Sequence, residues 1–392
     1  MVNLSRRHFL QATGAALATA GLHQVFSHQQ TVLAQPTRRK LALIVGINDY
    51  AEAPLKGCVN DAILQQRLLV HRFGFHPDDV VMLLDADATR QSILDAFEEH
   101  LIKQAKPGDV AMFHYSGHGS LVRDPHPIFV DRRHRGMNGT FVPVDSTLPS
   151  RYPDEGGSVN DIMGHTLFLL MSALKTENFT AVLDSCHAGG ATRDLRVRSR
   201  DVNEKITIAD AEKAYQEDWL ARLDWTHDQF VERYRAGVAN GVVLAGAQRL
   251  QLAIDEQFPG FSAGAFTYRL TQHLWQTETT PYDAIAHINR SMPRFYRQRS
   301  LWEAEQGSGY EAEPMYFIDE PNPTAAAIAV TVEGDRAALL IVGIHPSEIT
   351  PGQVFQSSDR AAWVEVRDRQ GLVAIGQVRG TLQSGTPLQL RR

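Results

Sequence analysis

The sequence predicts an α/β fold in which helices flank a mostly parallel sheet, followed by a small all-β domain. Between residues 40 and 186, short apolar runs alternate with amphipathic stretches, which is typical of parallel strands joined by helices. After residue 323 the helical spacing ends, and short β-branched runs are separated by turns that contain Gly, Pro and Asp. The 392 residues, 43% of them hydrophobic, are enough for about two or three domains with a large core.

The first part of the chain supplies the strands and helices of the predicted sheet. Its strands are short apolar runs bounded by polar or Gly-containing segments, and the stretches between them have the spacing of amphipathic helices. We expect strands at residues 40–45, 80–84, 110–114 and 179–183, and helices at 61–72, 89–104 and 161–174.

A long insertion follows at residues 191–240. Its first part is rich in arginine, and its later part has helical apolar spacing, with Tyr215, Trp219, Leu223, Phe230 and Tyr234. A strand at 242–245 and a helix at 265–276 then complete the first domain, which we place at residues 38–320.

Pro321 and Pro323 mark a break, because closely spaced prolines favour an extended linker. Short strands separated by turns are expected beyond them, at residues 328–332, 338–342, 363–366 and 373–378. This pattern predicts a small β sandwich or barrel over residues 324–392, without a catalytic constellation of its own.

Residues 1–34 have the form of a twin-arginine signal peptide. Arg6 and Arg7 precede an apolar stretch rich in Ala, Thr and Gly, and the triplet VLA favours cleavage after Ala34. The stretch is short and interrupted, so no stable membrane span is expected after signal removal. We therefore expect the protein in the periplasm or an equivalent extracytoplasmic lumen; a disordered basic tail is the alternative.

Charge and cysteine content narrow the function classes. The formal charge of -6 becomes -8 without residues 1–34, because two arginines and no acid leave, so nucleic acid is not an expected partner. The chain contains only two cysteines, Cys58 and Cys186, and both are expected to be free thiols.

Two motifs directly follow predicted buried strands: residues 114–119, with the sequence HYSGHG, and residues 184–190, with the sequence DSCHAGG. Because ligands bind at the carboxyl ends of parallel strands, His118 and Cys186 are expected to meet at one sheet edge. There His118 would take the proton of the Cys186 thiol and later donate it to the leaving amine. The amides of Gly119 and Cys186 would bind the oxyanion of a tetrahedral intermediate.

Two simpler interpretations compete with this one. A buried cysteine is usually an inert small hydrophobic residue. A zinc site built from His114, His118, Cys186 and His187 would use common zinc ligands, but the spacing of a zinc finger is missing. His114 is expected to be a core histidine, or one that orients the loop, because it alternates inward on its strand.

The sequence resembles the metacaspases, and specifically their bacterial branch, the orthocaspases, which are caspase-like cysteine peptidases. The resemblance covers roughly residues 40–319. It rests on the HYSGHG and DSCHAGG motifs and on residues 40–50 (KLALIVGINDY), 55–62 (LKGCVNDA) and 264–268 (GAFTY). It implies a caspase-like fold and a cysteine endopeptidase with a Cys-His dyad.

Substrate choice follows from the acids near the thiol. Asp184 lies two residues before Cys186 and should point to the same face, where a carboxylate favours a cation. The resemblance implies that Cys58, Asp61, Ser116 and Asp184 form the pocket for the residue before the scissile bond, so polypeptides cut after Arg or Lys are the expected substrates. Asp61 has a second possible role, as a cap of the helix that follows it.

No cofactor is expected. Many metacaspases require calcium, but residues 135–139 and the pair Asn160-Asp161 lack most of the carboxylates that would bind it. Arg132, Arg133 and Arg135 add opposing positive charge. The resemblance therefore leads us to expect calcium-independent activity, with Asn160 and Asp161 capping the helix that follows.

The insertion suggests self-processing. Basic residues follow Cys186 on a polar stretch that we expect to be mobile and accessible, so that it enters the cleft; the candidates are Arg193, Arg196, Arg198, Arg200 and Lys205. A solvated charge run is the alternative interpretation. Two other functions also remain open: a catalytically silent caspase-like scaffold, and an envelope-binding protein that acts through the C-terminal β module.

Overall fold

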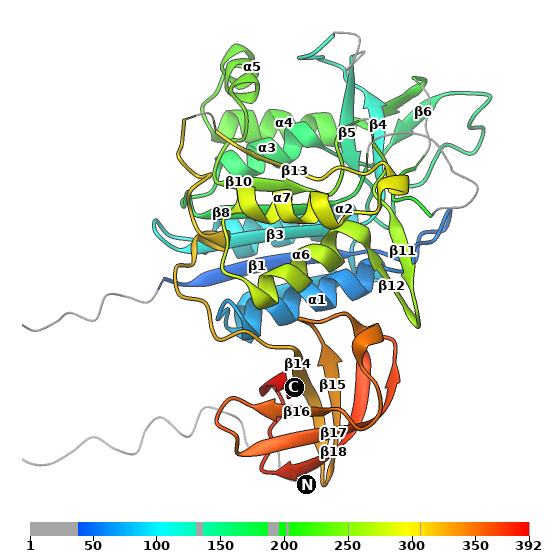
Figure 1. The fold of residues 1–392 in the computed structure, drawn as a ribbon. Coiled ribbons are helices and arrows are strands. Elements are labelled where there is room, and N and C mark those ends of the chain that lie inside the picture. The colour runs from blue at the N-terminus through cyan, green and yellow to red at the C-terminus, as the bar shows by residue number, and fades with distance from the viewer. Residues whose placement is uncertain are drawn as a thin grey trace, which may run out of the picture. The chain divides into compact units, whose positions relative to one another are not determined.

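The main sheet has six strands in the order β13-β10-β8-β3-β1-β2 (Figure 1). Five of them are parallel, and β13 runs antiparallel to β10. The strands are β1 (Lys40–Gly46), β2 (Val80–Leu84), β3 (Val110–Ser116), β8 (Phe179–Asp184), β10 (Val242–Ala245) and β13 (Leu301–Ala304). The prediction of a mostly parallel, helix-flanked sheet is therefore confirmed.

The computed structural model describes residues 38–130, 136–186, 196–200, 204–249, 251–305 and 307–391. The expected signal peptide with Arg6 and Arg7, the basic run Arg132, Arg133 and Arg135, the motif residue His187 and the candidate Arg193 lie outside the described residues. In the described part, no helix is both long and apolar enough to cross a membrane.

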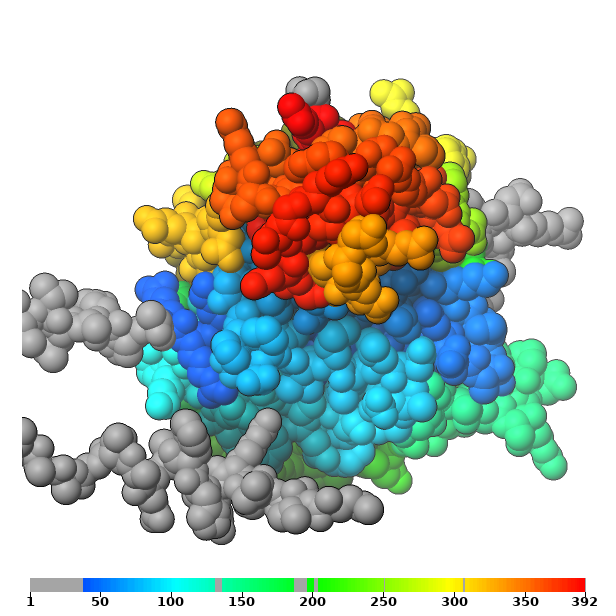
Figure 2. All heavy atoms as spheres, turned by 90° about the horizontal axis from the view of Figure 1, so that it is seen from below, coloured from blue at the N-terminus to red at the C-terminus, as the bar shows by residue number. Residues whose placement is uncertain are grey.

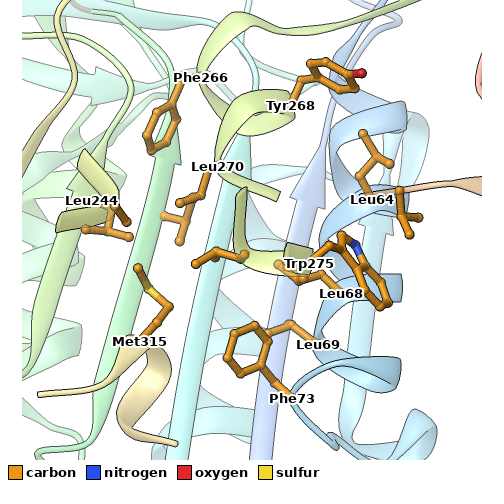
Figure 3. Packing of buried hydrophobic residues seen from close by; sticks show 14 of the residues in the cluster. Leu64, Leu68, Leu69, Phe73, Leu244, Phe266, Tyr268, Leu270, Trp275 and Met315 are labelled. Atoms are coloured by element: carbon orange, nitrogen blue, oxygen red, sulfur yellow. The ribbon is translucent and has the colours of Figure 1, made fainter. Parts of the chain in front are cut away.

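Each face of the main sheet packs against its own hydrophobic core. Along β1, Ala42 and Ile44 belong to one core while Leu41, Leu43 and Val45 belong to the other, as the two-residue period of a strand requires. The first core is covered by α1 (Cys58–His71), α6 (Ala265–Gln276) and α7 (Pro281–Ser291). Figure 3 shows Leu68 and Leu69 of α1 facing Leu270 and Trp275 of α6 across this core.

The second face carries the remaining helices. They are α2 (Arg90–Ala96), the π-helical segment η3 (Phe97–Ile102), α3 (Gly164–Ser172), α4 (Asp210–Arg222) and α5 (His227–Ala236). The single helical stretch expected in the insertion is thus two helices, α4 and α5. Short 3₁₀ turns lie at η1 (Pro77–Asp79), η2 (Asp85–Asp87), η4 (Arg294–Tyr296), η5 (Met315–Phe317) and η6 (Pro346–Glu348).

Two small sheets frame one end of the main sheet. A five-stranded sheet has the order β6-β9-β4-β5-β7, and β11 pairs with β12 as a hairpin. Their bounds are β4 (Gly119–Arg123), β5 (Met137–Phe141), β6 (Gly157–Val159), β7 (Ile162–Met163), β9 (Ile206–Ile208), β11 (Asp255–Phe258) and β12 (Phe261–Gly264). The sequence did not predict them, because strands of only two to five residues show little periodicity.

The C-terminal strands form a closed antiparallel barrel in the order β14-β15-β18-β17-β16-β19, so the expected sandwich or barrel is a barrel. The strands are β14 (Ala327–Glu333), β15 (Arg336–Ile341), β16 (Val354–Ser357), β17 (Ala362–Gln370), β18 (Val373–Gly380) and β19 (Pro387–Leu390). Figure 2 shows the orange to red barrel against the blue part of the chain that includes α1. Leu340, Val342 and Leu372 of the barrel belong to the same core as α1 and α6.

Candidate active site

The two sequence motifs meet at one edge of the main sheet. Strands β3 and β8 are neighbours, and Ser116 pairs with Asp184 in their register. His118 and Cys186 each lie two residues beyond these paired positions. The topology therefore brings the imidazole and the thiol to the same strand ends, as the motifs predicted.

The imidazole of His118 is held in one tautomer. Its Nε2 donates to the carbonyl oxygen of Ala53 at 2.7 Å, which leaves Nδ1 as the proton-accepting nitrogen. Nδ1 is buried and has no hydrogen-bond partner among the residues that the structure describes. The Tyr50 ring packs against the imidazole at 4.5 Å between centroids. Burial is the main cause that lowers the pKa of His118 to about 4, so the ring is neutral near pH 7.

The Cys186 thiol is free and 1% exposed. Burial raises the pKa of Cys186 to about 11, and hydrogen bonds with the Ala253 backbone and the Ser199 side chain act in the opposite direction. Thiol and imidazole are thus both neutral in this arrangement. A proton has to leave the sulfur for it to become nucleophilic, and the free Nδ1 of His118 is suited to accept it.

Two backbone amides converge on one carbonyl oxygen beside the thiol. The amides of Gly119 and Cys186 donate to the oxygen of Arg198 at 3.0 and 3.1 Å. These are the two amides that the sequence suggested as oxyanion donors, and here they hold a carbonyl of the chain itself.

Residues 196–200 run through the site between two sets of backbone partners, with a bend at Arg198. The Arg198 amide donates to Ala253 at 2.9 Å, the Asp255 amide donates to Arg196 at 3.0 Å, and the Arg200 amide donates to Gly119 at 2.8 Å. Val197 forms an antiparallel bridge with Ile254, and Ser199 a parallel bridge with Gly119. The segment is thus held by a single β-bridge on each side of Arg198, a short form of the backbone pairing by which peptides are recognised. The expectation that this part of the insertion is accessible is wrong for Arg198 and Arg200, whose side chains are 0% and 10% exposed.

The side chain of Arg198 is fully buried in an acidic pocket. Its guanidinium lies 2.6 Å from Asp61, 2.6 Å from the Ser116 hydroxyl and 3.1 Å from Asp184. Cys58 is fully buried at the start of α1, and the Arg198 charge acts on its thiol. The four residues that the resemblance assigned to a pocket therefore surround one arginine.

Asp255 is a pocket residue that sequence reasoning missed. Its Oδ1 lies 3.0 Å from the Arg198 guanidinium, and its carboxylate also accepts the amides of Lys56 and Gly57 at 2.9 and 3.0 Å. Asp255 begins β11, so one residue fixes the loop before α1 and contacts the arginine. No local signal marks it, because all of these contacts are far apart in sequence.

The segment 264–268 completes the pocket. The Gly264 amide donates to Asp61 at 2.9 Å, and the Thr267 hydroxyl donates to Asp184 at 2.6 Å. A Cβ on Gly264 would lie 2.1 Å from Asp184 and 2.6 Å from Arg198, so a side chain has no room there. The GAFTY motif at residues 264–268 therefore forms part of the pocket, a role that the sequence did not indicate.

Negative charge exceeds positive charge in this pocket. Asp61, Asp184 and Asp255 are all buried around Arg198. Burial raises the pKa of Asp61 to about 7, with Asp184 acting in the same direction and Arg198 against it. The pocket therefore gains from binding a cation, because unpaired carboxylates in low dielectric are costly.

Neither of the two caps considered from the sequence is present. The N-cap of α1 is Gly57, and no side chain caps that helix, so the alternative role of Asp61 as a cap is not found. The expected cap of the helix after Asn160 and Asp161 is wrong. Helix α3 begins at Gly164, and its N-cap residue is Met163, whose side chain makes no capping hydrogen bond. Asn160 and Asp161 therefore do not cap this helix.

Asp161 is instead fully buried between three partners. It accepts the hydroxyls of Thr140 and Ser146 at 2.6 Å each, and it pairs with Arg200 at 2.5 Å. The carboxylate thus belongs to the site rather than to a helix end.

The other candidate residues lie elsewhere. Arg196 is 38% exposed, with a loose contact to Asp255 at 3.7 Å, and Lys205 is exposed and donates to the Asp154 carbonyl. His114 is fully buried in β3, as expected for a core histidine. Among the described residues no cluster of His, Cys, Asp and Glu is arranged to hold a metal ion.

The caspase domain family, Peptidase_C14, matches residues 39–317. Metacaspase-1 of Schizosaccharomyces pombe is 26% identical over 283 residues, which cover 62% of each chain. Metacaspase-1 of Debaryomyces hansenii is 34% identical over 284 residues, covering 65% of this chain and 62% of the relative. The present chain thus spans about three fifths of the length of these curated relatives. The crystal structure of protein GSU0716 from Geobacter sulfurreducens aligns with 72% of this chain and all of its own, at 21% identity and a TM-score of 0.49.

Proposed function

This chain belongs to the caspase domain family of cysteine peptidases, and on that premise we propose that it is an endopeptidase that cuts polypeptides after arginine. In this proposal Cys186 and His118 form the catalytic dyad. The first bond cut is the chain's own Arg198-Ser199 bond.

The observation that carries the proposal is the position of Arg198. Its carbonyl oxygen rests on the amides of Gly119 and Cys186, while its guanidinium contacts Asp61, Asp184 and Ser116. A peptide bound for cleavage needs both contacts at once. The two amides polarise the reacting carbonyl, and the acidic pocket fixes the side chain of the residue that carries this carbonyl.

The proposed mechanism has four steps. Nδ1 of His118 takes the thiol proton as Cys186 Sγ attacks the Arg198 carbonyl carbon. The two amides stabilise the resulting oxyanion, and one such donor contributes about 3–4 kcal/mol to the transition state. His118 then protonates the Ser199 nitrogen, which leaves as a new amino terminus. Water hydrolyses the thioester with His118 as base and restores the thiol.

Arginine is expected to be preferred over lysine. The guanidinium contacts three carboxylates and one hydroxyl from different directions, which the planar fork of arginine matches and a single ammonium does not. Lysine should be cut more slowly for this reason.

Activity without calcium is also part of the proposal. Asp161 is fully buried and already paired with the Arg200 guanidinium, which would oppose a divalent cation at that carboxylate. Export through the twin-arginine signal, and hence an extracytoplasmic location, completes the proposal from the sequence alone.

The decisive experiment is self-cleavage of the purified chain at neutral pH with a calcium chelator present. We expect two fragments, the second beginning at Ser199 by N-terminal sequencing. Arg198→Ala and Cys186→Ala should remain intact, while Arg196→Ala, the matched control two residues away, should be cut normally. An intact wild-type chain that also fails on Arg-ended fluorogenic peptides would indicate a catalytically silent scaffold. Cleavage at another residue would overturn the assignment of Arg198.

A further inference from the structure

A second arginine is bound on the other side of the same peptide bond. Arg200 lies two residues beyond Arg198, and its side chain is 10% exposed. Its guanidinium lies 2.5 Å from Asp161, and it donates to the carbonyl and the hydroxyl of Ser146 at 3.3 and 3.4 Å. Arg200 is therefore seated in a pocket of its own rather than on the surface.

The floor of this pocket is charged and buried. Asp161 is fully buried, and its two other hydrogen-bond partners, Thr140 and Ser146, are neutral hydroxyls. Within the described residues, the one ion pair of Asp161 is that with Arg200. A buried carboxylate that loses its only cationic partner is strongly destabilised. The pocket should therefore favour another guanidinium in place of Arg200 when Arg200 withdraws.

The backbone makes this a fixed position relative to the proposed cut. The Arg200 amide donates to the carbonyl of Gly119 at 2.8 Å, and the amide of the same glycine holds the Arg198 carbonyl at 3.0 Å. One residue thus sets the register on both sides of the bond. A substrate whose backbone follows the path of residues 196–200 has the side chain of the second residue after the cut next to Asp161.

We propose that Asp161, Ser146 and Thr140 form a second specificity pocket, which selects arginine as the second residue after the cut. The inference rests on the proposed function and extends it. The expected substrates are then polypeptides that contain the pattern Arg-x-Arg and are cut after the first arginine. After self-cleavage Arg200 is only one residue from a new amino terminus, so an incoming substrate can displace it.

The test uses three internally quenched peptides that share the sequence Val-Arg-Ser-X, with X as Arg, Ala or Glu. For the processed wild-type enzyme, kcat/KM should be at least about tenfold higher for Arg than for Ala, because the pocket pairs a buried carboxylate. Glu should be the poorest of the three. Ratios between peptides within one enzyme do not depend on the fraction of enzyme that is active.

Two variants and a control sharpen the test. Asp161→Asn should bring the three peptides close to equal, and relief of the discrimination against Glu is an effect that mere loosening of the fold does not produce. Arg200→Ala should keep or increase the Arg preference, since the competing side chain is gone. Asp154→Asn changes an exposed acid on a neighbouring loop. In this control the ratios of kcat/KM between the three peptides should be the same as in the wild-type enzyme.

The possible failures are distinct. Cleavage of all three peptides at equal rates by both wild-type and Arg200→Ala enzyme would overturn the second pocket and leave the proposed function intact. Absence of cleavage after arginine in every peptide would overturn both.

Discussion

The backbone amide of Cys186 lies 3.1 Å from the carbonyl oxygen of Arg198. The residue that carries the thiol therefore holds the carbonyl that it is proposed to attack. Because the amide nitrogen and Sγ of one cysteine are separated by only three bonds, N–Cα, Cα–Cβ and Cβ–Sγ, covalent geometry keeps the sulfur in the neighbourhood of that carbonyl.

Loss of either dyad member should stop cleavage without unfolding the protein. Cys186→Ala removes the nucleophile and His118→Ala removes the base, and the two act as one unit, so their effects should not add. Activity on an Arg-ended coumarin amide and circular dichroism would check this. A double variant much less active than either single variant would contradict it.

Asp255 should matter for cleavage after arginine as much as the acids predicted from the sequence. Asp255→Asn and Asp184→Asn each remove one charge from a fully buried arginine site, and breaking such a pair costs about 3–5 kcal/mol, or roughly a hundredfold or more in kcat/KM. Glu256→Gln is the matched control, because this neighbour on β11 pairs with Arg269 instead. Equal rates for Asp255→Asn and wild-type enzyme would remove Asp255 from the pocket.

The Cys186 thiol should be slow to alkylate while Arg198 occupies the site. With its pKa raised to about 11 by burial, the thiol stays protonated through neutral pH, so the rate should keep rising with pH well above 9. Iodoacetamide labelling of His118→Ala, which cannot process itself, would measure this. Adding Arg198→Ala should accelerate labelling at pH 7, and an unchanged rate would show that the segment does not cover the thiol.

Burial of His114 should make the fold sensitive to acid. Burial lowers the pKa of His114 to about 3, so the folded state stays neutral there while the unfolded state gains a proton as the pH falls below about 6.5. The contribution is complete above that pH and declines toward pH 3, losing about 2 kcal/mol between pH 7 and pH 5. Urea unfolding of Cys186→Ala with and without His114→Phe would test it. The aromatic variant should lose less stability on acidification, and identical pH dependence would contradict the assignment.

The barrel should influence the pocket through one close backbone contact. A Cβ on Gly371 would lie 2.6 Å from the carbonyl oxygen of Gly260, in the turn of the hairpin that carries Asp255. Gly371→Ala should therefore lower both the melting temperature and activity on Arg-ended peptides. Gly334→Ala is the control, since its φ of +60° matches the +58° of Gly371 but nothing lies within 4 Å of its Cβ position. Equal behaviour of the two variants would exclude a contribution from the contact.

The parts of the fold that the sequence predicted are those with a strong local signal. The strands β2 and β10 and the helix α6 have the predicted bounds, because uninterrupted apolar runs and regular helical spacing are strong local signals. The hairpin β11–β12 and the second sheet have no such signal, since their strands are short and are stabilised by distant partners.

The same distinction explains what was missed in the site. Arg198 stands in a polar, arginine-rich stretch, and local sequence alone makes such a stretch look solvated. Its burial depends on Asp61, which lies 137 residues away in the chain. Asp255 was missed for the same reason, because its importance comes from the three elements that it joins and not from its neighbours.

A site filled by its own chain has kinetic consequences. Since residues 196–200 already lie between the two sets of backbone partners, the proposed first cut would be a unimolecular event, and its half-time should not change when the protein is diluted. Each molecule would perform that reaction once. Foreign peptides would be admitted only afterwards, so a freshly folded preparation should show a lag whose length is independent of enzyme concentration.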